Sequence, residues 1–252
     1  MERICNVIKT LFRFKNCCCS RKIIKSNCSD EVSKIDPKSI VSWNIQGLFL
    51  FMKKIKISNV IQKIREFDSD VICLQEAFEE SIKIKIINEL KDIYPYYLCG
   101  CIDRKYNVGE DSGLLILSKY NINFKKEYFL NGCEFPDNLA NKTILYFSVG
   151  NYNFSNTHVQ ANNDFIAGNQ VKEIINQSPF QDFIIVGDLN HCKADTILNV
   201  EKNNSVYTWN DEILDYILPI KCDDKKIDVN VITMDLTNIS DHLPIKGIIK
   251  KV

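Results

Sequence analysis

The chain has 252 residues, 45% of them hydrophobic and 25% charged, and no apolar run reaches the roughly 18 residues that cross a bilayer. This composition is that of a globular protein with one large or two small domains, and it argues against a membrane span. The formal net charge of zero hides an asymmetry: residues 1–28 carry seven Lys or Arg and one acid, hence +6, which leaves −6 for the rest. A mildly acidic body argues against strong non-specific affinity for nucleic acid.

The first 36 residues differ in composition from the rest, and we expect a basic, cysteine-rich segment ahead of one catalytic domain over residues 37–252. Ile4 and Ile8 stand at helical spacing with basic residues nearby, and the run Cys17–Cys19 follows. Cysteines beside a basic amphipathic helix are typical of S-acylated segments that associate with an anionic membrane surface. A disordered tail is the alternative, whereas adjacent cysteines without a nearby His lack the spacing of a zinc site.

The cysteines and the N-terminus together indicate a cellular setting. There are eleven cysteines, an odd number, and charged residues interrupt the apolar positions of the N-terminus, so no secretory signal is visible. Cysteines in such numbers without a signal favour a reducing compartment. We therefore expect an intracellular, cytoplasmic monomer that reaches a membrane surface, if at all, through its N-terminal segment.

From Ser39 onward, short apolar runs alternate with segments of helical periodicity. Apolar runs bounded by polar residues predict strands, and apolar residues at intervals of three and four predict helices. Helices before and after paired strands favour an α/β architecture of two packed sheets with helices outside. The predicted helices are Lys56–Phe67, Glu79–Leu90 and Asp164–Gln177. The predicted strands are Ser39–Ile45, Asp70–Gln75, Gly113–Ser118, Thr143–Val149, Asn151–Thr157, Phe183–Gly187, Ile213–Leu218 and Leu243–Ile249.

Polar residues that suit one active site stand at the ends of these strands, where the chain leaves the core. The protein has only three histidines, His158, His191 and His242, and each follows an apolar run or abuts acids and amides. Carboxylate and amide oxygens without a thiolate suit a hard divalent cation such as Mg²⁺, with Mn²⁺ as a substitute. The shared site would draw on Asn44, Glu76, His158, Asp188, Asn190, Asp215, Asp241 and His242.

These residue types favour attack on phosphorus. Glu76 is the natural metal ligand, and Asp188 can orient or deprotonate a water for in-line attack. Histidines opposite the metal would stabilise the charge of the transition state, and a nearby acid, Asp215 or Asp241, would hold His242 protonated. The sequence contains neither a Gly-x-Ser-x-Gly elbow nor a P-loop, so phosphoester hydrolysis is favoured over acyl transfer.

An ordered set of motifs carries a family resemblance. The chain resembles the endonuclease/exonuclease/phosphatase superfamily, with the DNase I-like fold, and the resemblance extends from Ser39 to Val252. It implies a four-layer α/β sandwich, dependence on Mg²⁺ and cleavage of a phosphoester. The motifs, all in the family's order, are Ser42–Gln46 (SWNIQ), Val71–Glu76 (VICLQE), Ser112–Leu114 (SGL), Thr157-His158, Gly187–Asn190 (GDLN), Leu214–Tyr216 (LDY) and Ser240–His242 (SDH).

The resemblance also implies a role for each matching residue. Glu76 would bind the metal, with Asn44 beside it and Asp241 near it. Asp188 would position or activate the water, and Asn190 would contact the scissile phosphate. The same phosphate would be flanked by His158 and His242, with Asp215 paired to one of the two histidines. His191 matches no family role and is expected at the surface near the site.

Within the superfamily, the segments Thr157–Ala161 and Ser112–Tyr120 look like the neutral sphingomyelinase branch. Abasic-site endonucleases of the exonuclease III type usually carry Tyr-x-Pro-Asn where this chain has Asn156-Thr157-His158. Inositol-polyphosphate 5-phosphatases typically show Trp-Cys-Asp-Arg, and the nearest segment here is Trp209–Glu212. The stretch Trp43–Leu48 resembles tyrosyl-DNA phosphodiesterases as well, which keeps a nucleic-acid substrate open.

The sequence therefore leaves three functions open. A phosphodiesterase for a sphingomyelin-like phospholipid leads, and a nuclease or DNA-end-processing enzyme follows. A scaffold protein without catalysis is third, and the presence of every acid and histidine that the chemistry needs speaks against it. The loops Cys101–Asp111 and Asn131–Lys142 are expected to select the substrate, and the short connection from Thr208 to Asp215 leaves little room for a long membrane-inserting hairpin.

Overall fold

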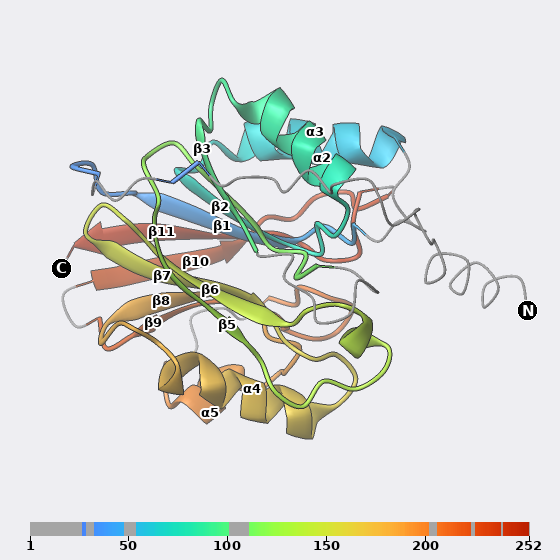
Figure 1. The fold of residues 1–252 in the computed structure, drawn as a ribbon, viewed down its shortest axis with the longest axis vertical. Helices are drawn as coiled ribbons and strands as arrows, with labels where there is room; N and C mark the ends of the chain where they lie inside the picture. Colours follow the sequence, from blue (N-terminus) through green and yellow to red (C-terminus); the bar gives the residue numbers. More distant parts are fainter. Residues whose placement is uncertain are drawn as a thin grey trace, which may run out of the picture.

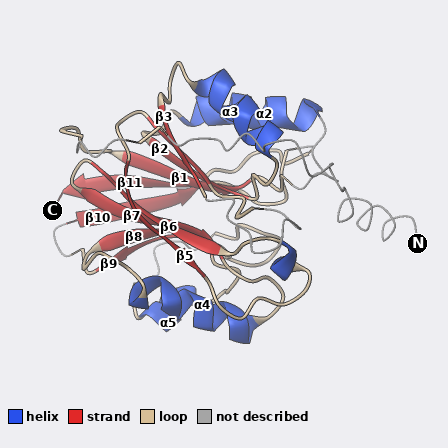
Figure 2. Cartoon of the chain, in the orientation of Figure 1, coloured by secondary structure: helices blue, strands red, loops and turns tan. Residues whose placement is uncertain are grey.

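Two mixed β-sheets pack face to face in the computed structural model, and helices cover both outer faces (Figure 1). This confirms the predicted four-layer α/β sandwich. The six-stranded sheet has helices α2 (Lys54–Phe67) and α3 (Glu80–Leu90) on its outer face (Figure 2). In spatial order its strands are β10 (Lys225–Val231), β11 (Ile245–Lys251), β1 (Ser39–Asn44), β2 (Val71–Gln75), β4 (Leu115–Ser118) and β3 (Tyr96–Cys99).

The five-stranded sheet carries α4 (Asp164–Asn176) and the short α5 (Ala194–Leu198) on its outer face (Figure 1). The side chain of Asn163 caps α4 by accepting a hydrogen bond from the backbone N–H of Ile166 at 3.1 Å. In spatial order the strands are β5 (Asn123–Phe129), β6 (Thr143–Val149), β7 (Tyr152–His158), β8 (Phe183–Asp188) and β9 (Asp215–Ile220).

Much of the predicted N-terminal segment lies outside the described residues, including Cys17–Cys19 and the helical pattern before it. Within the described part, Asn27 forms a bridge to Tyr97 on the edge strand β3, and Asp36 accepts a hydrogen bond from Asn151. No helix in the described part of the chain is long and apolar enough to cross a bilayer. The structure describes residues 27–28, 33–47, 54–100, 111–201, 206–222, 225–237 and 239–251.

The central strands send alternate side chains into two different cores. Ile40 on β1 packs in the core between the sheets, whereas its neighbour Val41 packs beneath α2 and α3. On β8, Ile184 faces the core between the sheets and Ile185 faces α4. Because both faces of these strands are buried, their sequences are nearly continuous apolar runs, which is why they could be predicted.

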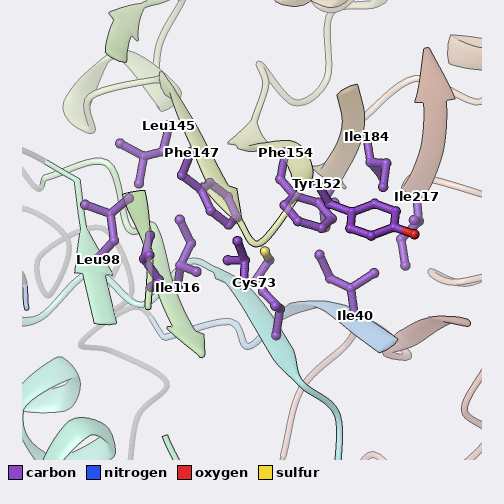
Figure 3. Packing of buried hydrophobic residues seen from close by; sticks show 14 of the residues in the cluster. Ile40, Cys73, Leu98, Ile116, Leu145, Phe147, Tyr152, Phe154, Ile184 and Ile217 are labelled. Carbon is purple, nitrogen blue, oxygen red and sulfur yellow. The ribbon is translucent and has the colours of Figure 1, made fainter. Parts of the chain in front are cut away.

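The core between the sheets is built from side chains of both sheets that point toward one another. Figure 3 shows Ile40 and Cys73 of the first sheet facing Phe154 and Ile184 of the second. The rings of Phe147 and Phe154 stack with their centroids 5.4 Å apart. Cys73 is fully buried there, as expected for a small apolar residue.

Three strands and one helix were not predicted from the sequence. β5 (NFKKEYF) and β10 (KKIDVNV) are edge strands with charged residues, and β3 has only four residues. An edge strand with a solvated face needs no continuous apolar run, so its pattern is weak. The helix α5 has only five residues. Three predicted strands also begin two residues too early, since the structure starts them at Leu115, Asp215 and Ile245. The strand from Asp215 includes Pro219, which an edge strand tolerates.

Candidate active site

The predicted site residues gather at one end of the sandwich. β1 and β2 are parallel, and so are β7 and β8, so the two strands of each pair end on the same side of their sheet. Asn44 ends β1 and Glu76 follows β2, while His158 and Asp188 are register partners at the ends of β7 and β8. Asp215, the first residue of the antiparallel β9, pairs with Asp188. The expectation of one shared cluster at strand ends is met by these five residues.

Strand alternation explains why these side chains face one another. His158 stands four residues beyond Phe154, and Asp188 two beyond Val186, so both share the inner face with the central core. Glu76 breaks this rule, because it directly follows the inward-facing Gln75. Its φ of 55° lies in the left-handed region, which ends the strand and turns the carboxylate toward Asn44.

Two glycines leave room for this turn at Glu76. A Cβ on Gly47 would lie 2.2 Å from the carbonyl oxygen of Glu76, and one on Gly113 would lie 3.2 Å from its Cα. Gly113 has a φ of +67° and accepts a hydrogen bond from the N–H of Ala77 at 2.8 Å. The backbone of Glu76 is therefore enclosed by two chain segments that approach as closely as only glycine permits.

Asn44 connects the acids of the two sheets. Its Nδ2 donates to Oε1 of Glu76 at 3.0 Å and to Oδ2 of Asp188 at 3.0 Å, and its Oδ1 accepts from the N–H of Gln46 at 2.9 Å. In this arrangement the amide N–H₂, and not the carbonyl oxygen, faces the carboxylates. Asn44 thus holds Glu76 and Asp188 side by side, and its role as a metal ligand stays a prediction.

Both histidines approach Asp188 through Nε2. The distances to Oδ2 of Asp188 are 3.7 Å from His158 and 3.8 Å from His242, and Nε2 of His158 is also 3.9 Å from Oε1 of Glu76. On the other side of its ring, Nδ1 of His242 lies 2.8 Å from Oδ2 of Asp215. Asp188 is therefore the point at which the two histidines and the carboxylate set meet.

The two histidines differ in charge. Burial lowers the pKa of His158 well below its ordinary value, and the cations Lys142 and His242 lower it further. Burial alone would also lower the pKa of His242, but the charges of Asp215 and Asp188 outweigh it and raise that pKa to about 10. His242 is thus a cation and His158 a neutral imidazole at neutral pH.

Of the two acids expected to hold His242 protonated, Asp215 does so and Asp241 does not contact it in this way. Oδ2 of Asp241 accepts instead from Nε2 of Gln46 at 2.8 Å and lies 3.4 Å from Nε1 of Trp209. The short turn that carries His242 is fixed to β1, because its backbone oxygen accepts from Nε1 of Trp43 at 3.0 Å.

Asn190 contributes backbone as well as side chain. With a φ of 42° it donates its N–H to Oδ1 of Asp188 at 2.9 Å, and its Nδ2 donates to the carbonyl of Val159 at 3.2 Å. It therefore orients Asp188 from the side opposite Asn44. His191 lies apart from the cluster, half-buried, with Nδ1 accepting from the N–H of Lys193 at 3.1 Å.

The donor set fits a hard divalent cation. The ligand atoms of Asp188, Asp215 and His242 lie within 4.8 Å of one another and form one candidate group. Asp215 and His242 already pair with each other, however, which leaves Glu76 as the carboxylate for a cation, with Asp188 beside it. Burial is the main cause that raises the pKa of both acids, and a bound cation would add to the positive charge of His242 in favouring their anionic forms. Oxygen ligands of this kind suit Mg²⁺ or Mn²⁺.

Comparison with known proteins identifies the family. Residues 41–242 match the model of the endonuclease/exonuclease/phosphatase family. The chain belongs to this family. A sphingomyelinase C of Bacillus cereus is 30% identical in an alignment of 169 residues that covers 54% of this chain and 49% of that protein. A phospholipase C of Staphylococcus aureus is 29% identical in an alignment of 182 residues that covers 56% of this chain and 55% of that protein. The chain thus spans about half the length of these curated relatives.

Solved structures of the endonuclease/exonuclease/phosphatase type share the fold. A beta toxin of Staphylococcus aureus, crystallised as a mutant with bound magnesium ions, gives a TM-score of 0.68 at 22% identity, covering 85% of this chain and 99% of that one. A humanized TDP2 of D. rerio gives 0.62 at 16% identity, with coverage of 85% and 99%. These likenesses establish the DNase I-like fold.

The structure adds a buried cation that the sequence reasoning did not single out. Nζ of Lys142 donates to the carbonyl of Val159 at 2.9 Å and lies 3.1 Å from Oδ2 of Asp137. Its positive charge lowers the pKa of both Glu76 and His158, so Lys142 lies close to the candidate active site. The sequence predicts that the loop Asn131–Lys142 selects the substrate, but a lysine that precedes a strand has no distinguishing sequence signal.

A second group of residues, Lys56, Gln46 and Trp209, has no role predicted from the sequence and lies on the Asp241 side of the site. Nζ of Lys56 donates to the backbone oxygen of Gln46 at 3.1 Å and to its Oε1 at 2.9 Å. Gln46 in turn binds Asp241, and the indole of Trp209 lies 6.2 Å from the ring of His242. Trp209 is thereby the aromatic side chain closest to the histidines among the described contacts.

Proposed function

We propose that the chain is a Mg²⁺-dependent phosphodiesterase that hydrolyses a sphingomyelin-like phospholipid, with Mn²⁺ able to replace Mg²⁺. One observation carries the proposal: Asp188 lies between a cationic histidine, a neutral histidine and the Asn44–Glu76 pair, at the junction of the two sheets. This places an anion-binding face and a carboxylate face within a few ångströms of each other. Phosphoester hydrolysis needs both, since a phosphate must be bound while water attacks it.

Each residue has a role that its contacts support. Asp188 accepts a proton from the attacking water, and Asn190 holds its other oxygen in place. His242, kept cationic by Asp215, donates Nε2–H to a phosphate oxygen, and neutral His158 flanks the same group. When bound, Mg²⁺ supplies a Lewis acid that offsets phosphate charge, and Glu76 is its proposed protein ligand, with Asp241 and Asn44 nearby.

The choice of substrate rests on the relatives. Curated relatives at 30% and 29% identity carry the names sphingomyelinase C and phospholipase C. The resemblance of the segment Thr157–Ala161 to the neutral sphingomyelinase branch supports the same choice. Membrane attachment through the basic N-terminal segment, an intracellular location and a monomeric state remain predictions, since the acylation candidates Cys17–Cys19 lie outside the described residues.

A nucleic-acid substrate is the second candidate. A TDP2 of D. rerio with the same fold was solved in complex with single strand DNA product, at a TM-score of 0.61 and 15% identity. In this chain the half-buried indole of Trp209 stands next to His242, where an aromatic ring could stack on a base. The acidic body of the protein weighs against this candidate.

Parallel assays on the full chain with Mg²⁺ distinguish the two candidates. Sphingomyelin in mixed micelles is one substrate, and single-stranded and plasmid DNA are the others, with Glu76→Gln as the matched control. Phosphocholine release that requires Glu76 would support the lipid phosphodiesterase. DNA cleavage without release of phosphocholine would overturn the lipid assignment and establish a nuclease.

A further inference from the structure

A layer of buried polar side chains lies between the central core and the candidate active site. Ser42, Gln75 and Asn156 come from β1, β2 and β7, and each is 0% exposed. Farther from the site, the space between the two sheets is filled largely by apolar side chains. By strand alternation each of the three shares the inner face with a core residue two positions earlier, namely Ile40, Cys73 and Phe154, which Figure 3 shows pointing into the space between the sheets.

These three side chains form a hydrogen-bonded bridge across the sandwich. Nε2 of Gln75 donates to Oδ1 of Asn156 at 2.8 Å, which joins the first sheet to the second. The same Nε2 lies 3.2 Å from Oγ of Ser42. Nδ2 of Asn156 donates back across the gap to the carbonyl of Leu74 at 3.3 Å. Hydrogen bonds therefore run from the first sheet to the second and from the second to the first, and they hold the two sheets at a fixed separation.

Every member of the bridge is one or two residues from a side chain of the site. Ser42 precedes Asn44 by two positions, and Asn156 precedes His158 by two, on the same strand face. Gln75 directly precedes Glu76. A change in the length of the bridge would therefore be transmitted to both faces of the site through short, fully paired strands.

The energetic cost of burying these amides calls for an explanation. Apolar side chains of the same volume would fill the space without requiring hydrogen-bond partners, and they are often no less stabilising than a buried polar pair. An apolar contact, however, permits the sheets to slide, whereas a satisfied polar network fixes one arrangement. A cation and a phosphate held between two sheets require donors placed within about 0.5 Å.

We propose that Gln75, Asn156 and Ser42 are positioning residues that fix the spacing of the two sheets at the site. They set the separation of Glu76, on the first sheet, from His158 and Asp188 on the second. The inference rests on the proposed function, because that spacing matters only if a cation and a phosphate bind between the sheets. None of the three touches the reacting groups, so they act through their neighbours in the chain.

The double variant Q75M/N156L tests this most directly. It replaces both amides of the bridge by apolar side chains of similar volume, which removes both partners of the Gln75–Asn156 bond at once. The hydroxyl of Ser42 and the carbonyl of Leu74 each lose one partner. Binding of Mg²⁺ and Mn²⁺ to the full chain is measured by calorimetry, without substrate. Outer residues that orient metal ligands are typically worth 10- to 100-fold in metal affinity, so we expect Kd to rise by about tenfold or more.

Thr157→Val is the matched control. Thr157 lies between Asn156 and His158, is equally buried, and donates from Oγ1 to the carbonyl of Thr143 at 2.9 Å within its own sheet. The variant loses one buried hydrogen bond on the same strand but leaves the bridge intact. Its Kd for the cations is expected within about twofold of that of the unaltered protein, since the bond that it loses stays within one sheet.

A folded double variant that binds both cations as tightly as Thr157→Val would overturn the inference. If the double variant does not fold, Asn156→Ala decides, because it removes the two contacts that cross the gap: a Kd above that of Thr157→Val supports the positioning role, and an equal Kd refutes it. Failure of the unaltered chain to bind either cation would overturn the proposed function and the inference with it. The two failures are thus told apart by the unaltered protein alone.

Discussion

Two histidines with different charges meet at one carboxylate in this site. The difference arises because only His242 has an acid on its second ring nitrogen, whereas Nδ1 of His158 is buried without a hydrogen-bond partner among the described residues. A fixed cation beside Asp188 can stabilise negative charge on a phosphate. A neutral imidazole can donate one N–H to the same phosphate without adding a second positive charge. The two histidines are therefore not interchangeable.

His242→Ala is expected to lower turnover of the proposed phosphodiester substrate by about 10²- to 10⁴-fold, the range that loss of a preorganised charge-stabilising donor produces. The fold should persist, because the backbone oxygen at position 242, which accepts from Nε1 of Trp43, is retained in the variant. Steady-state kinetics and circular dichroism on the same preparation check both statements. Extensive unfolding would instead assign His242 a structural role.

The partner of His242 also shows where the sequence stops being informative at this scale. Residue chemistry left Asp241 and Asp215 as equal candidates, and only the family resemblance paired Asp215 with a histidine. Consecutive residues point their side chains in different directions, however, so Asp241 turns to Gln46. Asp215 is 27 positions away and reaches His242 only because β9 pairs with β8. Such a long-range pairing leaves no local pattern in one sequence.

At the scale of the elements, burial decides what could be predicted. The central strands β1, β2, β7 and β8 are covered on both faces, so their buried runs stand out, and their polar ends mark the site. The edge strands β5 and β10 are solvated on one face and carry charges, so they resemble loops in the sequence. The bridge of Ser42, Gln75 and Asn156 was missed for a related reason, because one polar residue inside an apolar strand does not reveal its partner on another sheet.

A buried ion pair fixes α3 to the segment that encloses Glu76. Lys83 on α3 is 1% exposed and pairs with Asp111, whose Oδ1 accepts from the N–H of Gly113 at 2.7 Å. Lys83→Met would leave Asp111 buried without its cation. The free energy of unfolding is expected to fall by about 3 to 5 kcal/mol, the usual cost of removing one partner of a buried pair.

Urea denaturation followed by fluorescence measures this loss. The control is Lys63→Met, because Lys63 pairs with Glu66 on the solvent side of α2, where exposed ion pairs contribute little. A change in stability as small as that of the control would contradict the structural role assigned to the Lys83–Asp111 pair.

At the scale of the whole molecule, the site is a junction between two sheets. Glu76 belongs to the first sheet and Asp188 to the second, and Asn44 joins them. A cation bound at Glu76, beside Asp188, would therefore bind the native sandwich and not the unfolded chain. Ligands that bind only the native state raise its stability in proportion to the logarithm of their concentration.

Mg²⁺ at about 100 times its Kd should accordingly raise the free energy of unfolding by about 2.7 kcal/mol. For a protein of this length that corresponds to a rise in Tm of about 5 to 10 °C, which a chelator should reverse. Thermal unfolding followed by dye fluorescence checks it. Glu76→Gln should abolish the shift, and a shift of equal size in that variant would place the cation elsewhere.

The most direct test of the account is hydrolysis of phosphodiesters by the full chain with and without divalent cation. Sphingomyelin and single-stranded DNA are supplied to the unaltered protein and to Glu76→Gln, with a chelator added and then Mg²⁺ restored. The account predicts turnover of one of the two substrates that stops with chelator, returns with Mg²⁺ and is absent in the variant. Turnover that persists in chelator, or in Glu76→Gln, would contradict a metal-dependent site built on Glu76 and Asp188.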